Sequence, residues 1–272
     1  MSAGSSEEFL SGTAGEMTGI RAVSRALARD GWADAVGLAR GVPWRLRRAA
    51  ARWPARRVLV LAVERDDAPN LLAAAAQEVQ RSHHHVRFVA GTIGGRGKFE
   101  NLDALLGEHP AAGHDWLLVL DDDVVLPAGF LDAFVFLAER FGLRLAQPAH
   151  RQRSHAAWTV TRRQAGSVAR ETAFVEIGPV VGLHASTFET LLPFPRLRFG
   201  WGLDLHWSAL AQRHGWRIGV LDATPIRHGL RVVAASYGHP EAIAEAREFL
   251  ARRPFTPASE ANRSLVVHRS WL

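Results

Sequence analysis

The sequence contains no cysteine. Disulfide bonds and thiolate metal sites are therefore excluded, and any metal ion must be held by oxygen or imidazole ligands. Long apolar runs are also lacking: the run from Val58 to Val63 has the length of a buried strand, whereas crossing a bilayer takes roughly 20 residues. The N-terminus is polar and acidic, without the basic start and apolar core of a secretory signal. We therefore expect a cytoplasmic protein.

The composition is that of a globular chain. Of 272 residues, 47% are hydrophobic and 22% are charged, so the chain can bury a sizeable core. The formal net charge is +6, and the basic residues, nearly all of them arginine, cluster at Arg45, Arg47, Arg48, Arg52, Arg56 and Arg57. This cluster predicts either a solvated basic helix or a surface for peripheral contact with a membrane. No nucleic acid partner is expected, because the basic residues do not alternate with aromatics on a strand.

From residue 57 onward, strand patterns alternate with helix patterns. Apolar runs predict strands over residues 58–63, 86–90 and 116–120, and helices over 70–80, 99–107 and 127–141. This alternation predicts an α/β fold with a Rossmann-like, mostly parallel central sheet flanked by helices. Ligands of such sheets bind beyond the carboxyl ends of the strands. Glu64, Thr92 and Asp121 stand at those ends.

Three adjacent aspartates follow the strand that ends at Leu120. Asp121, Asp122 and Asp123 repel one another unless a cation neutralises them. The alternation of side chains along a strand puts Asp121 and Asp123 on one side and Asp122 on the other. Two carboxylates on one side suit a hard divalent cation, Mn²⁺ or Mg²⁺, that also binds diphosphate oxygens. The alternative is a solvated turn in which one aspartate caps the next helix.

A glycine-rich segment, Gly94-Gly-Arg-Gly-Lys-Phe-Glu-Asn101, precedes this strand. Its glycines let the backbone approach a phosphate closely, and Arg96 or Lys98 supplies positive charge. A flexible loop that only caps a helix is the alternative. The consecutive histidines His83, His84 and His85 cannot all face one ion, so we interpret them as surface residues.

The aspartate motif and the order of the flanking segments resemble those of the GT-A glycosyltransferases, of the family 2 kind, in the nucleotide-diphospho-sugar transferase superfamily. The resemblance covers roughly residues 57–230. It implies a metal site formed by Asp121, Asp123 and His228. It also implies that a nucleotide-sugar donor, with a UDP-sugar favoured, is bound by Glu64, Arg96, Lys98, Asn101, Asp121 and Asp122.

The segment Phe199-Gly-Trp-Gly-Leu-Asp204 is similar to the acceptor-side segment of that family. There an acidic residue at the start of a helix is the catalytic base of inverting enzymes, which implies this role for Asp204. Trp201 is expected to stack on a sugar, and Glu176 and Trp158 are expected to line the acceptor site. The sequence does not identify the acceptor.

Composition, helical spacing and the resemblance together divide the chain. We expect a disordered tail over residues 1–15, a basic helical extension of two or three short helices over 16–56, a nucleotide-sugar-binding half over 57–148, an acceptor-binding half over 149–230 and a C-terminal helical segment over 231–272.

Two other functions remain open at this point. A phosphatase of the haloacid-dehalogenase type also has a hydrophobic strand followed by two aspartates in the spacing of Asp121 and Asp123. That motif normally opens its domain, however, and here two strand-helix units precede it. The other alternative is a nucleotide-binding module without catalytic activity, which would leave the carboxylate cluster without a purpose.

Overall fold

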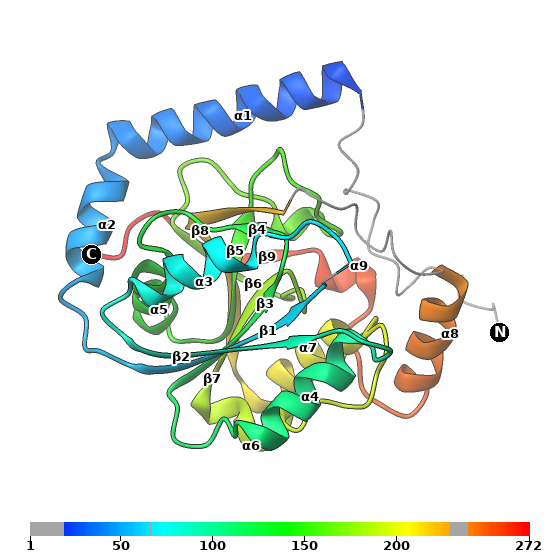
Figure 1. Cartoon of the computed structure of the whole chain (residues 1–272). Coiled ribbons are helices and arrows are strands. Elements are labelled where there is room, and N and C mark those ends of the chain that lie inside the picture. The colour runs from blue at the N-terminus through cyan, green and yellow to red at the C-terminus, as the bar shows by residue number, and fades with distance from the viewer. Residues whose placement is uncertain (1–18, 66, 229–238) are drawn as a thin grey trace.

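The computed structural model describes residues 19–65, 67–228 and 239–272. The expected tail over residues 1–15 lies outside these ranges. A twisted central sheet carries helices on both faces, and the long helix α1 runs along one edge of the molecule (Figure 1). The strands are β1 (Arg57–Glu64), β2 (His85–Thr92), β3 (Trp116–Asp121), β4 (Val124–Val125), β5 (Leu143–His150), β6 (Ala169–Thr172), β7 (Val180–His184), β8 (Arg217–His228) and β9 (Ser264–His268).

The helices pack around this sheet. Among the described residues they are α1 (Ile20–Ala39), α2 (Val42–Ala50), α3 (Leu72–Gln80), α4 (Lys98–Glu108), α5 (Phe130–Arg140), α6 (Phe188–Leu191), α7 (Leu203–His214), α8 (His239–Leu250) and α9 (Ala258–Ala261). Within the described ranges, none of these helices has the length and hydropathy that crossing a bilayer requires.

The sheet order is β2-β1-β3-β7-β5-β8-β6-β9, with β4 paired to β8. β2, β1 and β3 pair in parallel, as the alternation of strands and helices predicts. β7 is antiparallel to both β3 and β5, β5 is parallel to β8, and β6 is antiparallel to β8 and β9. β2, β1, β3, β5, β8 and β9 therefore run in one direction, and β7 and β6 run in the other. The carboxyl ends of β1, β3 and β8 meet at one edge.

The two faces of β1 bury side chains in two separate cores. Val58 and Val60 pack with the residues of α3 and α5 on one face. Leu59 and Leu61 pack with those of α4 and α7 on the other. Burial on both faces explains the continuous apolar run of this strand. β3 is buried on both faces in the same way, so the aspartates at its end lie at the exit of a fully packed strand.

Several element boundaries differ from the sequence expectation. α3 begins at Leu72 rather than residue 70, because the Oδ1 of Asn70 accepts the N–H of Leu72 and starts the helix there. β8 continues to His228, seven residues beyond the apolar stretch that ends at Leu221. The C-terminal segment is not only helical: β9 adds a strand to the sheet beside β6.

The N-terminal extension consists of two helices, within the two or three expected, but the first is 20 residues long rather than short. A carboxylate fixes α1 to the body of the protein. Asp30 is 4% exposed, and its two oxygens accept the backbone N–H groups of Gln152 and Arg153 at 2.8 and 2.9 Å. One turn further, Asp34 forms ion pairs with Arg151 and Arg163.

We expect Asp30→Ala to lower the free energy of unfolding by about 2–4 kcal/mol, because two backbone N–H groups lose their acceptor. Urea denaturation at neutral pH measures the loss. Asp34→Ala is the matched control: its carboxylate is 40% exposed, so solvent screens its ion pairs and the loss is smaller. An unchanged stability of Asp30→Ala would contradict this account of α1 docking.

Candidate functional site

The carboxyl end of β3 carries Asp121, which pairs with a lysine. The Nζ of Lys98, in the first turn of α4, lies 2.6 Å from Asp121 Oδ1 and donates to the carbonyl of Ile177 at 3.3 Å. The backbone N–H of Asp121 donates to the carbonyl of Pro179. Lys98 is the sole lysine of the chain. The site therefore holds an ammonium group beside the first aspartate.

Gly178 lets the chain pass this ion pair. A Cβ at that position would lie 2.7 Å from Lys98 Nζ and 3.1 Å from Asp121 Oδ2. Any side chain there would displace one of the two charged groups. Sequence reasoning did not place Gly178 beside Lys98 and Asp121, because the contact joins segments that are distant along the chain.

Strand pairing brings Asp123 to His228. The short β4 pairs antiparallel with the end of β8, with Val124 opposite His228. His228 Nε2 then lies 3.0 Å from Asp123 Oδ1. Burial alone would lower the pKa of His228, but the hydrogen bond and charge of Asp123, with the charge of Asp121, outweigh it and raise the pKa.

Asp121, Asp123 and His228 together could hold a metal ion. One ligand atom from each lies within 4.8 Å of the others. Two carboxylates and one imidazole suit Mn²⁺ or Mg²⁺, and the remaining coordination positions would be open to water or phosphate oxygens. The side chain of Asp123 is 4% exposed, so a cation there would offset a charge that is costly to bury. The residues present therefore fit such an ion.

Asp122 points away from this group, as strand alternation predicts. Its Oδ2 accepts the N–H of Arg65, and its carbonyl accepts the N–H of Leu71. These two bonds fasten the end of β3 to the segment that follows β1. Glu64, the last residue of β1, is half-buried, and its Oε1 accepts the side-chain amide of Asn70 at 3.0 Å.

The glycine-rich loop before α4 is held in place by a buried asparagine. Asn101 is buried, and its amide donates to the carbonyls of Ile93 and Gly97. A Cβ at Gly97 would lie 2.1 Å from the carbonyl oxygen of Arg198, so this glycine is required by a neighbouring backbone. Arg96 is exposed at the tip of the loop. Asn101 thus fixes the shape of the loop, whereas Arg96 is free to reach outwards.

A buried network joins the metal-ligand candidates to Glu176. Ser154 Oγ accepts the N–H of His228 and donates to its carbonyl. The ring of His150, in contact with Ser154, hydrogen-bonds to Glu176 at 2.9 Å. Sequence reasoning missed His150 and Ser154, because His150 ends β5 and Ser154 follows it in a polar segment with no periodic pattern.

Glu176 is 5% exposed and accepts the N–H groups of Ala157 and Trp158. The ring of Trp158 is buried against Phe174 in a small core cluster, with ring centroids 4.4 Å apart. The backbone of Trp158, rather than its ring, therefore contacts Glu176.

Asp204 lies in the first turn of α7, which begins after Gly202 in the left-handed conformation. Its Oδ1 accepts the N–H of Leu205 at 2.9 Å. Burial raises the pKa of Asp204 to about 7; the Leu205 hydrogen bond opposes the rise, and the charge of Glu176 adds to it. The carboxyl group therefore changes protonation state close to neutral pH. Trp201, two residues before α7, is half-buried.

A second cluster contains histidines. His83, His84 and Asp132 also bring ligand atoms within 4.8 Å of one another. The expectation that the three consecutive histidines lie on the surface is wrong for His84, which is 5% exposed. Its Nδ1 accepts the N–H of Arg56, so the neutral ring carries its proton on Nε2. Neither nitrogen is then available to a metal ion, which makes this cluster a poor site.

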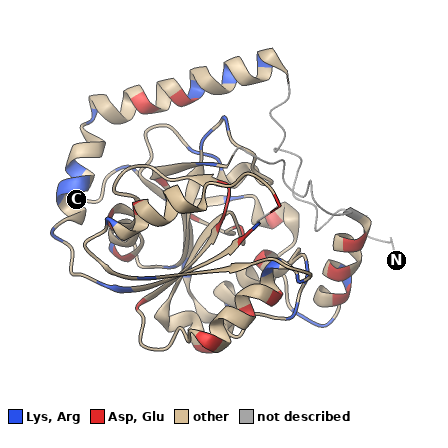
Figure 2. Cartoon of the chain, viewed as in Figure 1, with Lys and Arg blue, Asp and Glu red and all other residues tan. Residues whose placement is uncertain are grey.

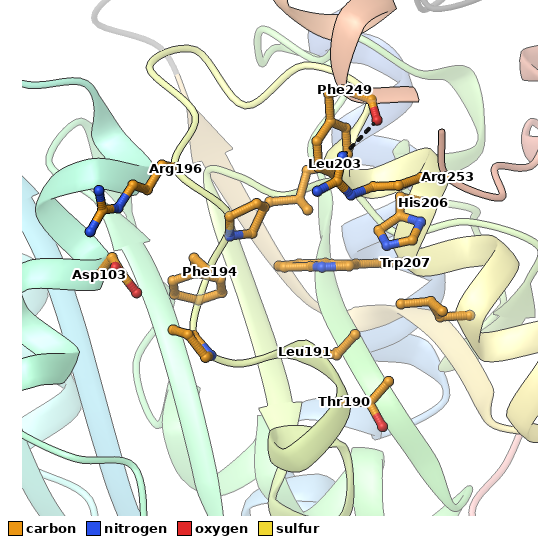
Figure 3. Close-up of a pocket in the computed structure, with 13 residues that line it drawn as sticks. Asp103, Thr190, Leu191, Phe194, Arg196, Leu203, His206, Trp207, Phe249 and Arg253 are labelled. Atoms are coloured by element: carbon orange, nitrogen blue, oxygen red, sulfur yellow. Dashed lines mark hydrogen bonds between the residues drawn. The ribbon is translucent and has the colours of Figure 1, made fainter. Parts of the chain in front are cut away.

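A cavity of about 490 Å³ lies between α4, α7 and the end of α8, apart from the aspartates. Figure 3 shows Trp207 across its middle, with Asp103 and Arg196 on one side and His206 and Arg253 on the other. Trp207 is 1% exposed and Phe194 2%, so core side chains border the cavity. The residues that line it include neither Asp121, Asp123 nor His228.

No protein-family model matches the chain. No curated protein matches its sequence. Among solved structures, the mannosyltransferase PcManGT from Pyrobaculum calidifontis, in complex with GDP-Man and Mn²⁺, is similar with a TM-score of 0.51 and 17% identity over 85% of this chain and 78% of that one.

The chain has a GT-A glycosyltransferase fold. More distantly similar structures are GalNAc-T7 with UDP, GalNAc and Mn²⁺ (TM-score 0.48, 10% identity, 68% of this chain and 45% of that one) and A197 from STIV (TM-score 0.44, 14% identity, 64% and 86%). This fold confirms the α/β class and the sheet flanked by helices expected from the sequence.

Proposed function

We propose that this chain is a metal-dependent glycosyltransferase that moves a sugar from a nucleoside-diphosphate donor to an acceptor hydroxyl. The observation that carries the proposal is the convergence of Asp121, Asp123 and His228 at the carboxyl edge of a GT-A sheet, with Lys98 beside them. The similar mannosyltransferase was solved with GDP-Man and Mn²⁺, which supports a donor and a cation of these classes.

On the donor side, Asp121, Asp123 and His228 would hold the cation. When bound, a divalent cation offsets the charge that develops on the departing diphosphate. Lys98 is half-buried and donates hydrogen bonds at this edge, so its ammonium group can turn from Asp121 to a phosphate oxygen. Arg96, exposed on the loop, adds a second positive charge. The hydrogen bonds of Glu64, Asn101 and Asp122 hold the surrounding loops in place for the nucleotide. We propose uridine as its nucleoside.

On the acceptor side, we assign the role of base to Asp204. A base must take the proton of the acceptor hydroxyl as that oxygen attacks the anomeric carbon, and a pKa of about 7 suits this work at neutral pH. Direct attack by the acceptor inverts the anomeric configuration. Trp201 would stack on the sugar. Glu176 would shape the acceptor site with the backbone of Trp158.

This assignment divides the chain as the sequence suggests, with the donor bound by residues 57–148 and the acceptor by 149–230. The phosphatase alternative fits less well. It needs Asp121 as a nucleophile on the strand that opens the domain, whereas β3 follows two earlier strands and Asp121 is paired with Lys98.

Release of nucleoside diphosphate tests the proposal. The protein is incubated with Mn²⁺ and, in turn, UDP-, GDP- and dTDP-sugars, and a parallel set contains EDTA. We expect release from one class of donor, abolished by EDTA. If an acceptor is then found, NMR of the product gives the anomeric configuration, and retention would contradict the role of Asp204. No release from any donor, with or without acceptor candidates such as sugars and lipid alcohols, would contradict the function.

We expect Lys98→Ala to weaken the binding of the nucleoside diphosphate about 10- to 100-fold, because a charge-assisted hydrogen bond to phosphate contributes roughly 1.5–3 kcal/mol. The binding of Mn²⁺ alone should not weaken, since Asp121 loses only a competing cation. Isothermal titration calorimetry measures both, and Lys98→Arg, which keeps the charge, should lose less. Equal diphosphate affinity in Lys98→Ala and the unmodified protein would contradict the role of Lys98.

A further inference from the structure

Helix α1 has a buried side and an exposed side of different character. Its buried side chains are Ala26, Asp30 and Ala33, which lie three or four residues apart and so share one face. On the outward side the tryptophan Trp32 is 67% exposed. Other exposed apolar side chains of this helix are Ile20, Leu27 and Leu38. At 3.6 residues per turn, Ile20, Leu27 and Leu38 lie along one flank of the helix and Trp32 lies along the other, so exposed apolar side chains border the outward side on both flanks.

Charge is segregated across the same helix. The acidic residues of α1 are Asp30 and Asp34, and both face inwards to partners on the 151–163 segment. Arg21, Arg25 and Arg29 are exposed, on the side that carries Trp32. The outward side of α1 therefore carries positive charge and apolar side chains, while the two carboxylates of the helix bind groups of the 151–163 segment.

Helix α2 extends this surface. Leu46 and Ala50 bury its inner face, whereas Trp44 is 64% exposed. Residues 35–63 contain no acidic residue, and Arg47, Arg48 and Arg52, in or just after α2, are exposed. Arg40 and Arg56 are not part of this surface, because they bind the carbonyl of Gly166 and the carboxylate of Glu139 in the body of the protein. Figure 2 shows the basic residues along α1 and α2 at the outer edge of the molecule. We call the outward side of α1 and α2 the N-terminal surface.

We propose that the N-terminal surface docks on a lipid bilayer that contains anionic headgroups. Tryptophan and leucine side chains partition into the boundary between headgroups and acyl chains, and arginines attract anionic lipid at the same depth. A second copy of the chain fits less well, because it would bring two arginine-rich surfaces together without acidic partners. The docking itself does not depend on the proposed enzymatic activity, and none of the residues of the N-terminal surface is assigned to that activity.

Docking would also orient the protein. Asp30 and Asp34 tie α1 to the 151–163 segment, and Ser154 of that segment holds the backbone of His228. The bilayer surface is thereby connected to the acceptor-binding half by a short series of direct contacts.

Vesicle flotation with the full chain tests the proposal. One set of vesicles contains phosphatidylcholine alone, and the other contains phosphatidylcholine with about 30% phosphatidylglycerol, an anionic lipid. Each arginine near an anionic surface contributes roughly fivefold to partitioning. The triple variant Arg25→Gln, Arg29→Gln, Arg48→Gln should therefore bind the anionic vesicles about 100-fold more weakly. Trp32→Ala with Trp44→Ala should also lose binding, and raising the salt concentration to about 1 M should release the unmodified protein.

The matched control removes the same charge elsewhere. Arg81→Gln, Arg213→Gln and Arg252→Gln change three exposed arginines outside α1 and α2 and should leave flotation nearly unchanged. Absence of flotation with anionic vesicles would overturn the proposal. Equal binding to both vesicle types, or equal losses in the two triple variants, would also overturn it. A third contradicting result is a dimer in sedimentation velocity that dissociates in the variant Trp32→Ala with Trp44→Ala, in a protein that does not bind vesicles.

Discussion

Asp123→Ala is expected to abolish metal-dependent donor binding and to lower turnover about a thousandfold or more, while the protein stays folded. Asp123 is a candidate ligand of the cation and the hydrogen-bond partner of His228. Without it, the cation that offsets the charge of the leaving diphosphate has no firm site. Calorimetric titration with Mn²⁺ and nucleoside diphosphate measures binding, and circular dichroism verifies the fold.

A matched control is available in the chain. Asp132 also lies beside a histidine, with 3.1 Å between its Oδ1 and His83 Nδ1, but it belongs to α5 rather than to the end of β3. Asp132→Ala should leave donor binding and turnover unchanged. Asp123→Asn, which keeps the shape of the side chain and removes its charge, separates charge from packing and should behave like Asp123→Ala. Unimpaired donor binding in both Asp123 variants would remove the basis of the metal site.

Asp204→Asn is expected to retain donor binding and to lose transfer by about 10²- to 10⁴-fold, because a general base is removed from a site that is otherwise intact. The rate of the unmodified protein should rise with pH through about 7, the pKa to which burial raises Asp204. A weakened donor affinity in Asp204→Asn, or a rate that does not change between pH 6 and 8, would exclude Asp204 as the base.

The same residue makes a prediction for stability. The pKa of Asp204 is higher in the folded protein than in the unfolded chain, so the folded state binds the proton more tightly. Its contribution to stability is therefore greatest below about pH 4 and is lost as the pH rises to about 7. Asp204→Asn removes this loss and should be more stable than the unmodified protein at pH 8, by on the order of 4 kcal/mol at most.

Thermal denaturation at pH 5 and pH 8 measures that difference. Asp222→Asn is the contrasting control, because Asp222 is fully buried in an ion pair with Arg170 at 2.8 Å. Breaking that pair leaves a buried positive charge and should destabilise the protein at pH 8. A lower melting temperature of Asp204→Asn at pH 8 would show that its carboxylate is stabilised by groups other than those described.

The first half of the fold could be predicted because its signals are local. β1 and β3 have apolar runs that are buried on both faces, and their order with the helices between them predicts parallel pairing. The second half could not. β6 and β9 are short and pair with each other across more than ninety residues, and β7 enters between β3 and β5, so that only tertiary contacts decide their partners.

The candidate site shows the same division. Asp121 and Asp123 follow from the charge pattern after a buried strand, and the resemblance to the GT-A enzymes supplied His228, which strand pairing brings to Asp123. Gly178 and Ser154 could not be found from sequence, because their roles arise from contacts between distant segments. Trp158 was expected to line the acceptor site because of its residue type, but its ring packs in the core.

The most direct test of the central claim is a thermal-shift measurement of the unmodified protein with nucleoside diphosphates, with and without Mn²⁺. A ligand present at about 100 times its dissociation constant stabilises the folded state by about 2.7 kcal/mol, which corresponds to roughly 5–10 °C here. We predict such a shift for one nucleoside diphosphate, and only with Mn²⁺. No shift with any nucleotide, together with stabilisation by Mg²⁺ and phosphate mimics, would contradict the glycosyltransferase and favour a phosphatase.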